Sequence, residues 1–135
     1  MNEDEYSKHL VIEPGIPLKK RQREINTAEW LICHFGGTII VKKESTKELS
    51  PDYDWDGMFW ELKTISTEKA ADSAVRKGIK QIMKNPGGII LDCRSSAIDR
   101  TKLLRVISNR VKKKRHRWLW ILILYSENEY EFRRY

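Results

Sequence analysis

The sequence predicts an α/β fold, an α/β sandwich in which helices flank a central mixed sheet. Its middle alternates short apolar runs of strand length with longer runs of helical period, which is typical of strands packed between helices. The chain has 135 residues, of which 40% are hydrophobic, enough for one core. An Asp-Gly pair also lies between two strand-like runs and predicts a tight hairpin. We therefore expect residues 1–135 to form a single domain.

The first third of the chain predicts one helix and one strand. The segment 1–20 is polar and acidic at first and then carries a Pro-Gly-Ile-Pro connector. It is expected to be an N-terminal arm, either ordered or mobile. A helix is expected from about 24 to 35, ending at the glycine pair 36–37. The β-branched residues at 38–42 predict a strand, and the polar residues at 43–50 a loop.

The hairpin carries the most information about function. With the Asp-Gly pair at the centre of a two-residue type I′ turn, cross-strand pairing aligns Asp52 with Glu61. Directly opposed side chains project to the same face, and alternation adds Asp54 and Lys63 to it. The hairpin is therefore expected to gather two or three carboxylates and one ammonium at one spot.

The second half of the chain predicts two helices and three strands. Periodicity and turn residues place most of their ends, and Asp99 is the expected cap of the second helix. The predicted elements are a helix over 68–84, a strand over 88–93, a helix from 99 to about 114, and strands over 118–125 and 130–135.

The expected chemistry is metal-assisted phosphodiester hydrolysis. Oxygen-rich clusters suit Mg²⁺ or Mn²⁺, which need few protein ligands, so Asp52 and Glu61 are the candidate metal ligands. Lys63 is expected to orient a water molecule or to stabilise charge on the phosphate. Asp54 and Asp56 are reserve acids that could replace Asp52 if the turn differs.

The same residues carry a family resemblance. Pro51-Asp52 followed by Glu61-Leu62-Lys63 resembles the PD-(D/E)XK nuclease motif. The wider run from Glu24 to Thr64 resembles the C-terminal nuclease domains of CdiA-type contact-dependent growth inhibition toxins. The resemblance covers roughly residues 20–93. It implies a restriction-endonuclease-like sandwich and, because these toxin domains often cut tRNA, a toxin-like RNase.

Two further residues enter through the resemblance. Glu24 projects within the apolar stripe of the first helix, and in the resembled toxins a glutamate there approaches the metal; favourable charge at a helix N-terminus is the alternative explanation. Glu29 is the fallback. Gln81 matches a helical glutamine that positions substrate in many nucleases of the superfamily, with a solvated glutamine as the alternative.

Substrate contacts are expected mainly from basic residues. A basic run after Asp99 could bind phosphates or an acidic inhibitor, or simply face solvent. Trp55 is the preferred base-stacking residue, whereas Trp118 and Trp120 are expected in the core. The candidate substrate-binding residues are Thr64, Gln81, Lys77, Lys80, Lys112, Lys113 and Lys114.

Composition restricts the class of partner. The formal net charge is +7, which favours nucleic acid, tRNA over DNA by the resemblance, or an acidic immunity protein. Cys33 and Cys93 have no metal-ligand spacing, the start shows no signal peptide, and the apolar run 118–125 is too short to span a membrane. We expect action in the cytoplasm, with delivery from a secreted toxin left open. A DNA endonuclease of a phage or mobile element and a non-catalytic nucleic-acid-binding domain are the alternatives.

Overall fold

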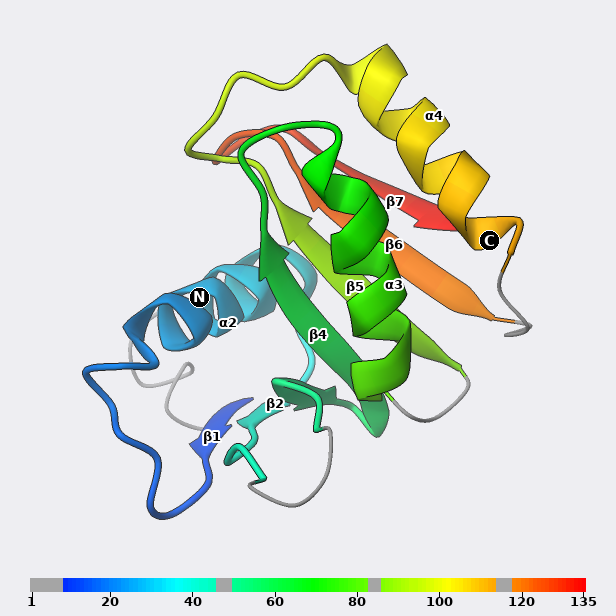
Figure 1. Ribbon diagram of the computed structural model, residues 1–135. Coiled ribbons are helices and arrows are strands. Elements are labelled where there is room, and N and C mark those ends of the chain that lie inside the picture. The colour runs from blue at the N-terminus through cyan, green and yellow to red at the C-terminus, as the bar shows by residue number, and fades with distance from the viewer. Residues whose placement is uncertain (1–8, 46–49, 83–85, 114–117) are drawn as a thin grey trace.

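The protein folds as a mixed sheet flanked by helices on both faces (Figure 1). The computed structural model describes residues 9–45, 50–82, 86–113 and 118–135. Within these ranges it has seven strands and three helices, which confirms the predicted α/β sandwich. The elements are β1 (Leu10–Ile12), α2 (Gln22–Phe35), β2 (Ile39–Val41), β3 (Tyr53–Trp55), β4 (Met58–Thr64), α3 (Ala70–Ile82), β5 (Gly87–Asp92), α4 (Arg100–Val111), β6 (Leu119–Leu124) and β7 (Tyr130–Arg134).

The strands lie in the sheet in the order in which they occur in the chain, from β1 to β7. Parallel pairing joins β1 to β2, β4 to β5 and β5 to β6. The other three pairs are antiparallel. The sheet is therefore mixed, as predicted.

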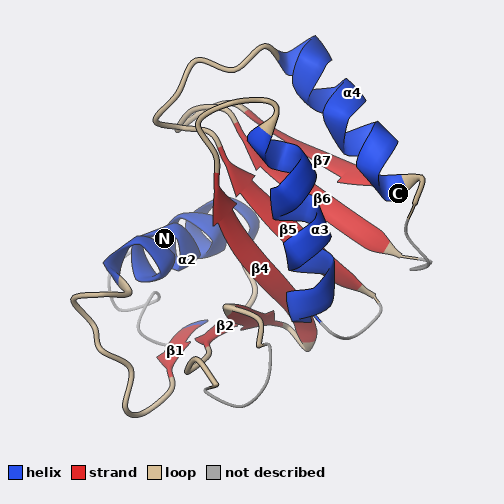
Figure 2. Cartoon of the chain, in the orientation of Figure 1, coloured by secondary structure: helices blue, strands red, loops and turns tan. Residues whose placement is uncertain are grey.

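The helices divide between the two faces of the sheet (Figure 2). Helices α3 and α4 pack on one face over Ile89, Leu91 and Ile121, and α2 packs on the other over Tyr53 and Trp60. All residues of β5 are buried, because this central strand is covered on both faces. This explains its continuous apolar run.

The β3–β4 hairpin has the predicted turn and register. Tyr53 pairs with Trp60, and Trp55 pairs with Met58. Asp56 has φ 51° and Gly57 has φ 88°, and a type I′ turn requires positive φ at both central residues. The strand faces therefore follow the alternation expected from the sequence.

The boundaries of other elements differ from the predictions by a few residues. Residues 10–12, within the segment left open between an ordered and a mobile arm, form β1 and pair with β2. Helix α4 ends at Val111 rather than near 114; Lys114 lies outside the described residues. Among the described residues, no helix is long and apolar enough to cross a membrane.

One core prediction is wrong. Trp118 was expected to be buried, but it is 45% exposed, because it lies just before β6 begins. The Arg134 guanidinium lies 3.7 Å from its ring centroid. The next aromatic residue, Trp120, is partly buried against the α2-side core.

Candidate active site

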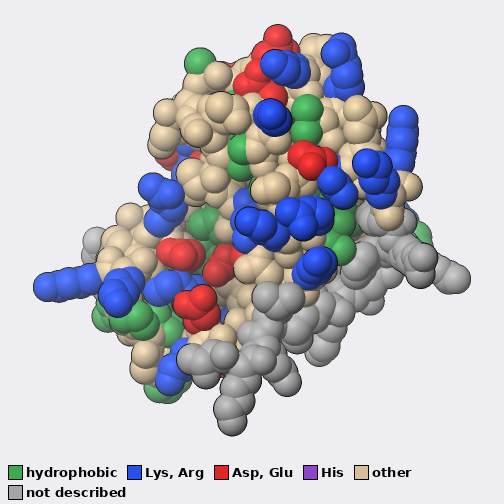
Figure 3. All heavy atoms as spheres, in the orientation of Figure 1, with side chains coloured by type: hydrophobic (Ala, Val, Ile, Leu, Met, Phe, Trp, Pro, Cys, Tyr) green, Lys and Arg blue, Asp and Glu red, His purple; other side chains and the backbone are tan. Residues whose placement is uncertain are grey.

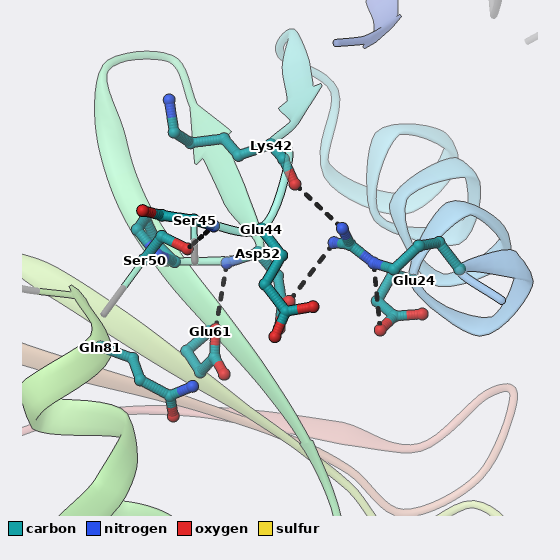
Figure 4. A pocket seen from close by; sticks show the side chains of 10 residues that line it. Glu24, Lys42, Glu44, Ser45, Ser50, Asp52, Glu61 and Gln81 are labelled. Atoms are coloured by element: carbon teal, nitrogen blue, oxygen red, sulfur yellow. Dashed lines mark hydrogen bonds and ion pairs between the residues drawn. The ribbon is translucent and has the colours of Figure 1, made fainter. Parts of the chain in front are cut away.

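A polar pocket lies at the base of the β3–β4 hairpin (Figure 4). The hairpin supplies its floor, the start of α2 supplies one wall, and the last turn of α3 supplies another. The residues that line it are Arg21, Glu24, Lys42, Glu44, Ser45, Ser50, Pro51, Asp52, Glu61 and Gln81.

Asp52 and Glu61 meet as the hairpin register requires. The backbone N–H of Asp52 donates to Glu61 Oε1 at 3.0 Å, and the N–H of Leu62 donates to Asp52 Oδ2 at 2.9 Å. Lys63 completes the group, with its Nζ 3.3 Å from Glu61 Oε2. Two carboxylates and one ammonium therefore share the base of a single hairpin, close to the predicted cluster.

Burial changes the acidity of both carboxyl groups. Glu61 is only 4% exposed. Burial first, and then the charge of Asp52, raise the pKa of Glu61 to about 8, against the opposing effect of Lys63. Burial also raises the pKa of Asp52, whose contact with Arg21 acts in the opposite direction. At neutral pH the pair therefore retains a proton unless a cation binds to it.

Glu24 lies on the α2 wall of the same pocket. Its carboxylate oxygen Oε1 is 3.3 Å from Nε of Arg21. The hydroxyl of the buried Tyr53 donates to the Glu24 backbone carbonyl, which ties the first turn of α2 to β3. Glu29, the fallback residue, is exposed on α2 and is not among the lining residues.

Gln81 faces Glu61 across the pocket (Figure 4). Its Oε1 is buried and has no hydrogen-bond partner among the described residues. A buried amide oxygen without a partner is unfavourable; Figure 4 shows it turned away from Glu61, with the amide nitrogen on the side of Glu61. Thr64, by contrast, is exposed at the end of β4 and does not line the pocket.

The two reserve acids accept hydrogen bonds in and beside the turn and not in the pocket. Asp54 Oδ1 accepts from the N–H of Gly57 at 2.8 Å, and Asp56 Oδ1 accepts from the N–H of Thr38 at 2.9 Å. Neither lines the pocket. Asp54 pairs with Phe59 in the predicted register. Its carboxylate, however, accepts the hydrogen bond from Gly57 in the turn, so it does not join Asp52 and Glu61.

Basic residues border the acidic pocket on the α3 side. Acidic side chains gather between α2 and the hairpin, and Lys and Arg side chains lie over α3 (Figure 3). Lys77 and Lys80 of α3 are exposed. A phosphate chain that crosses the pocket could therefore meet positive charge on leaving it.

The basic helix α4 is less available than the sequence suggests. Arg110 binds both carboxylate oxygens of Asp72, at 2.8 and 2.9 Å, and so joins α4 to α3. Arg100 and Lys102 are also ion-paired. Lys112 and Lys113 are exposed at the helix end.

The donor set fits a hard divalent cation. Among the described residues, no three Asp, Glu, His or Cys side chains form a ready-made metal cluster. Mg²⁺, however, is usually bound by one or two carboxylates, with water and phosphate oxygens completing its coordination. Asp52 and Glu61 could supply these carboxylates.

Three charged residues of the pocket belong to no motif in the sequence and were not predicted. They are Arg21 from the start of α2, and Lys42 and Glu44 after β2. None belongs to a motif, and only the docking of α2 beside the hairpin brings Arg21 to the carboxylates. A basic residue directly before a helix whose first turn faces an acidic hairpin was the only available signal.

Comparisons with known proteins add a fold-level relationship. No family model and no curated protein matches the sequence. Among solved structures, the chain is similar to a "CdiA-CT/CdiI toxin and immunity complex from Burkholderia pseudomallei". The TM-score is 0.58 with 16% sequence identity, and the match covers 93% of this chain and 98% of that chain. At this identity the likeness shows a shared fold.

Proposed function

We propose that this chain is a metal-dependent nuclease of the toxin type that hydrolyses phosphodiester bonds in RNA, with tRNA as the favoured substrate. The observation that carries the proposal is the buried Asp52–Glu61 pair, with Lys63 3.3 Å from Glu61. Burying two carboxylates side by side is unfavourable unless a proton or a cation compensates them. Lys63 and Arg21 offset part of this cost, but the pKa of Glu61 is still raised to about 8, which favours a further cation at the pair.

Each residue of the site has a distinct task in this proposal. Asp52 and Glu61 hold the divalent ion, which when bound lowers the pKa of a water and polarises the phosphoryl oxygen. Lys63 orients the attacking water or stabilises charge on the phosphate. Gln81, which lines the pocket beside Glu61, helps to position the substrate. Thr64, outside the pocket, is left as a contact for a neighbouring phosphate.

The RNA substrate is supported by the resemblance of the hairpin to toxin nucleases; the fold is shared with a chain of a toxin and immunity complex. The net charge of +7 suits either nucleic acid. A DNA endonuclease is therefore the second candidate. A domain that binds nucleic acid without cutting it is the third.

One assay separates these candidates. A labelled tRNA pool, a plasmid and a single-stranded DNA are incubated with the protein in Mg²⁺, in Mn²⁺, in Ca²⁺ and in chelator. We expect tRNA cleavage in Mg²⁺ or Mn²⁺ only. Cleavage restricted to DNA would replace the substrate, undiminished cleavage in chelator would reject the metal mechanism, and binding without cleavage would identify a non-catalytic domain.

A toxin of this type requires an inhibitor in the cell that makes it. The similar fold was solved in a toxin and immunity complex, and the basic surface of this chain complements an acidic protein. We therefore also propose an acidic immunity protein as partner, delivery as part of a secreted toxin, and action in the cytoplasm of the recipient. Growth arrest on cytoplasmic expression, absent in Glu61→Gln, tests the site of action.

A further inference from the structure

Arg21 is the least expected residue of the pocket. It precedes α2 as the N-terminal cap position, but its side chain makes no capping hydrogen bond. The residue is 9% exposed, so a charged group has been buried beside the hairpin. Burial of a guanidinium is favourable only when its N–H groups are paired.

Three nitrogen atoms of Arg21 reach three separate elements. Nη1 donates to the Lys42 backbone carbonyl at 3.0 Å, beyond the end of β2. Nη2 lies 3.4 Å from Asp52 Oδ1, and Nε lies 3.3 Å from Glu24 Oε1 on α2. A rigid, planar fork can satisfy such a divergent set, whereas the single ammonium of lysine cannot match this geometry.

The contact to Asp52 completes the orientation of that carboxylate. Its Oδ2 accepts from the Leu62 N–H at 2.9 Å, while its Oδ1 faces Arg21. Because each oxygen is approached by a different group, the plane of the carboxylate is fixed beside Glu61. The remaining lone pairs of both oxygens stay available to a cation.

We propose that Arg21 is the positioning residue of this site. It fixes the Asp52 carboxylate in its orientation toward Glu61, and it holds Glu24 at the pocket wall through the same guanidinium. The role rests on the proposed metal site, acts through Asp52 and involves no contact with the reacting atoms. A charge that merely balanced the acids would need no fork.

Replacement by lysine is the decisive variant, because it keeps the charge and removes the fork. Arg21→Lys and Arg21→Gln are compared with wild type and with Lys20→Gln, a matched control at an exposed neighbouring residue. Circular dichroism and thermal melting establish folding. Metal affinity is then measured without substrate, from Tb³⁺ luminescence and its displacement by Mg²⁺.

We expect Arg21→Lys to be folded and to bind the ions roughly 10-fold more weakly or worse, the range seen when residues that orient metal ligands are replaced. Its kcat should fall at saturating Mg²⁺, with KM within about twofold, because substrate contacts are untouched. Lys20→Gln should resemble wild type. Arg21→Gln should bind the ions and turn over substrate no better than Arg21→Lys. If Arg21→Gln does not fold, the test is made with Arg21→Lys alone.

Two results would overturn the role of Arg21 while leaving the metal site intact. Wild-type affinity and kcat in Arg21→Lys would show that charge alone suffices. Tighter metal binding in both variants would show that Arg21 competes with the ion. Absence of ion binding in wild type would instead reject the metal site and, with it, this role.

Discussion

The two ends of the β3–β4 hairpin use the same residue type in opposite ways. At the tip, Asp54 and Asp56 lie next to solvent and accept hydrogen bonds from backbone N–H groups. At the base, Asp52 and Glu61 are largely buried, lie against each other and have raised pKa values. Asp54 supports the turn that sets the register and Asp56 ties the turn to Thr38, whereas the base carboxylates, which that register brings together, are the proposed metal ligands.

This difference shows that the environment of a carboxylate, more than its place in a motif, decides its task. The tip is satisfied as it stands. At the base, Arg21 and Lys63 lie 3.4 and 3.3 Å from the two carboxylates, yet burial still raises both pKa values, so a proton or a further cation is favoured there. Substitutions at the two ends should therefore separate activity from stability.

The largest expected effect is the loss of cleavage in Glu61→Gln and in Asp52→Asn. Each change keeps the side-chain shape and removes a proposed metal ligand, so we expect kcat/KM to fall by about a thousandfold or more, roughly 4 kcal/mol. The matched control is Asp54→Asn at the tip, which should remain within about threefold of wild type. Cleavage assays that found the tip variant inactive and the base variants active would reverse the assignment.

Proton release on metal binding tests the base more directly. Because Glu61 has its pKa raised to about 8, the pair holds a proton at pH 7 that Mg²⁺ must displace, roughly one per ion. Calorimetric titration in buffers of different ionisation enthalpy counts this proton. Glu61→Gln should release none, and without saturating metal kcat/KM should rise with pH up to about 8 in wild type. A flat pH profile with no proton release would contradict the coupled pair.

The stability of the metal-free protein should depend on the same group. Between the ordinary glutamate pKa of 4.5 and the folded value of about 8, the folded state binds more protons than the unfolded state, so the free energy of unfolding falls as pH rises. We expect a loss on the order of 1–4 kcal/mol between pH 5.5 and 8.5. Urea unfolding measures it; Glu61→Gln should flatten the dependence, and Mg²⁺ should restore stability at pH 8.5.

At the tip, the expected effect is structural and smaller. Asp56→Ala leaves the Thr38 N–H without its side-chain acceptor, and Asp54→Ala does the same to Gly57. Each should lower the free energy of unfolding by about 1 kcal/mol, while the folded fraction retains its activity. Denaturant titration beside the cleavage assay checks both. A tip variant that lost activity at unchanged stability would place its carboxylate in the chemistry.

The smallest effect is expected from the basic residues at the end of α4, where paired and exposed charges again lie close together. Arg110 is held by Asp72, whereas Lys112 and Lys113 are exposed. Replacing the two lysines with Gln should reduce the log–log salt slope of nucleic-acid binding by up to about 1.8, and leave kcat unchanged. Arg110→Gln should instead lower stability. An unchanged slope would show that the two lysines do not contact phosphates, and Lys77 and Lys80 on α3 would then be the residues to replace.

The sequence predicts the elements that depend on local patterns. It does not predict the site residues whose positions depend on how helices pack against the sheet. Apolar period and turn chemistry placed α2, the hairpin and β5, and the hairpin register brought Asp52 to Glu61. The three-residue β1 is too short to carry a period and exists because β2 lies beside it. Arg21 lies outside every motif, and its position depends on how α2 packs. Trp118 was misassigned because it begins the apolar run in the sequence but precedes the first residue of β6, Leu119, which is the one that is buried.

The agreement between strand order and chain order has a consequence for how the protein acquires its structure. Each new strand of the sheet, from β2 onward, needs as its neighbour only the strand made just before it. Sheet growth can therefore proceed from one edge as the chain emerges from a ribosome or a narrow channel, without waiting for the last strand. In a polypeptide threaded N-terminus first, every residue that lines the hairpin pocket would have emerged before β6 and β7.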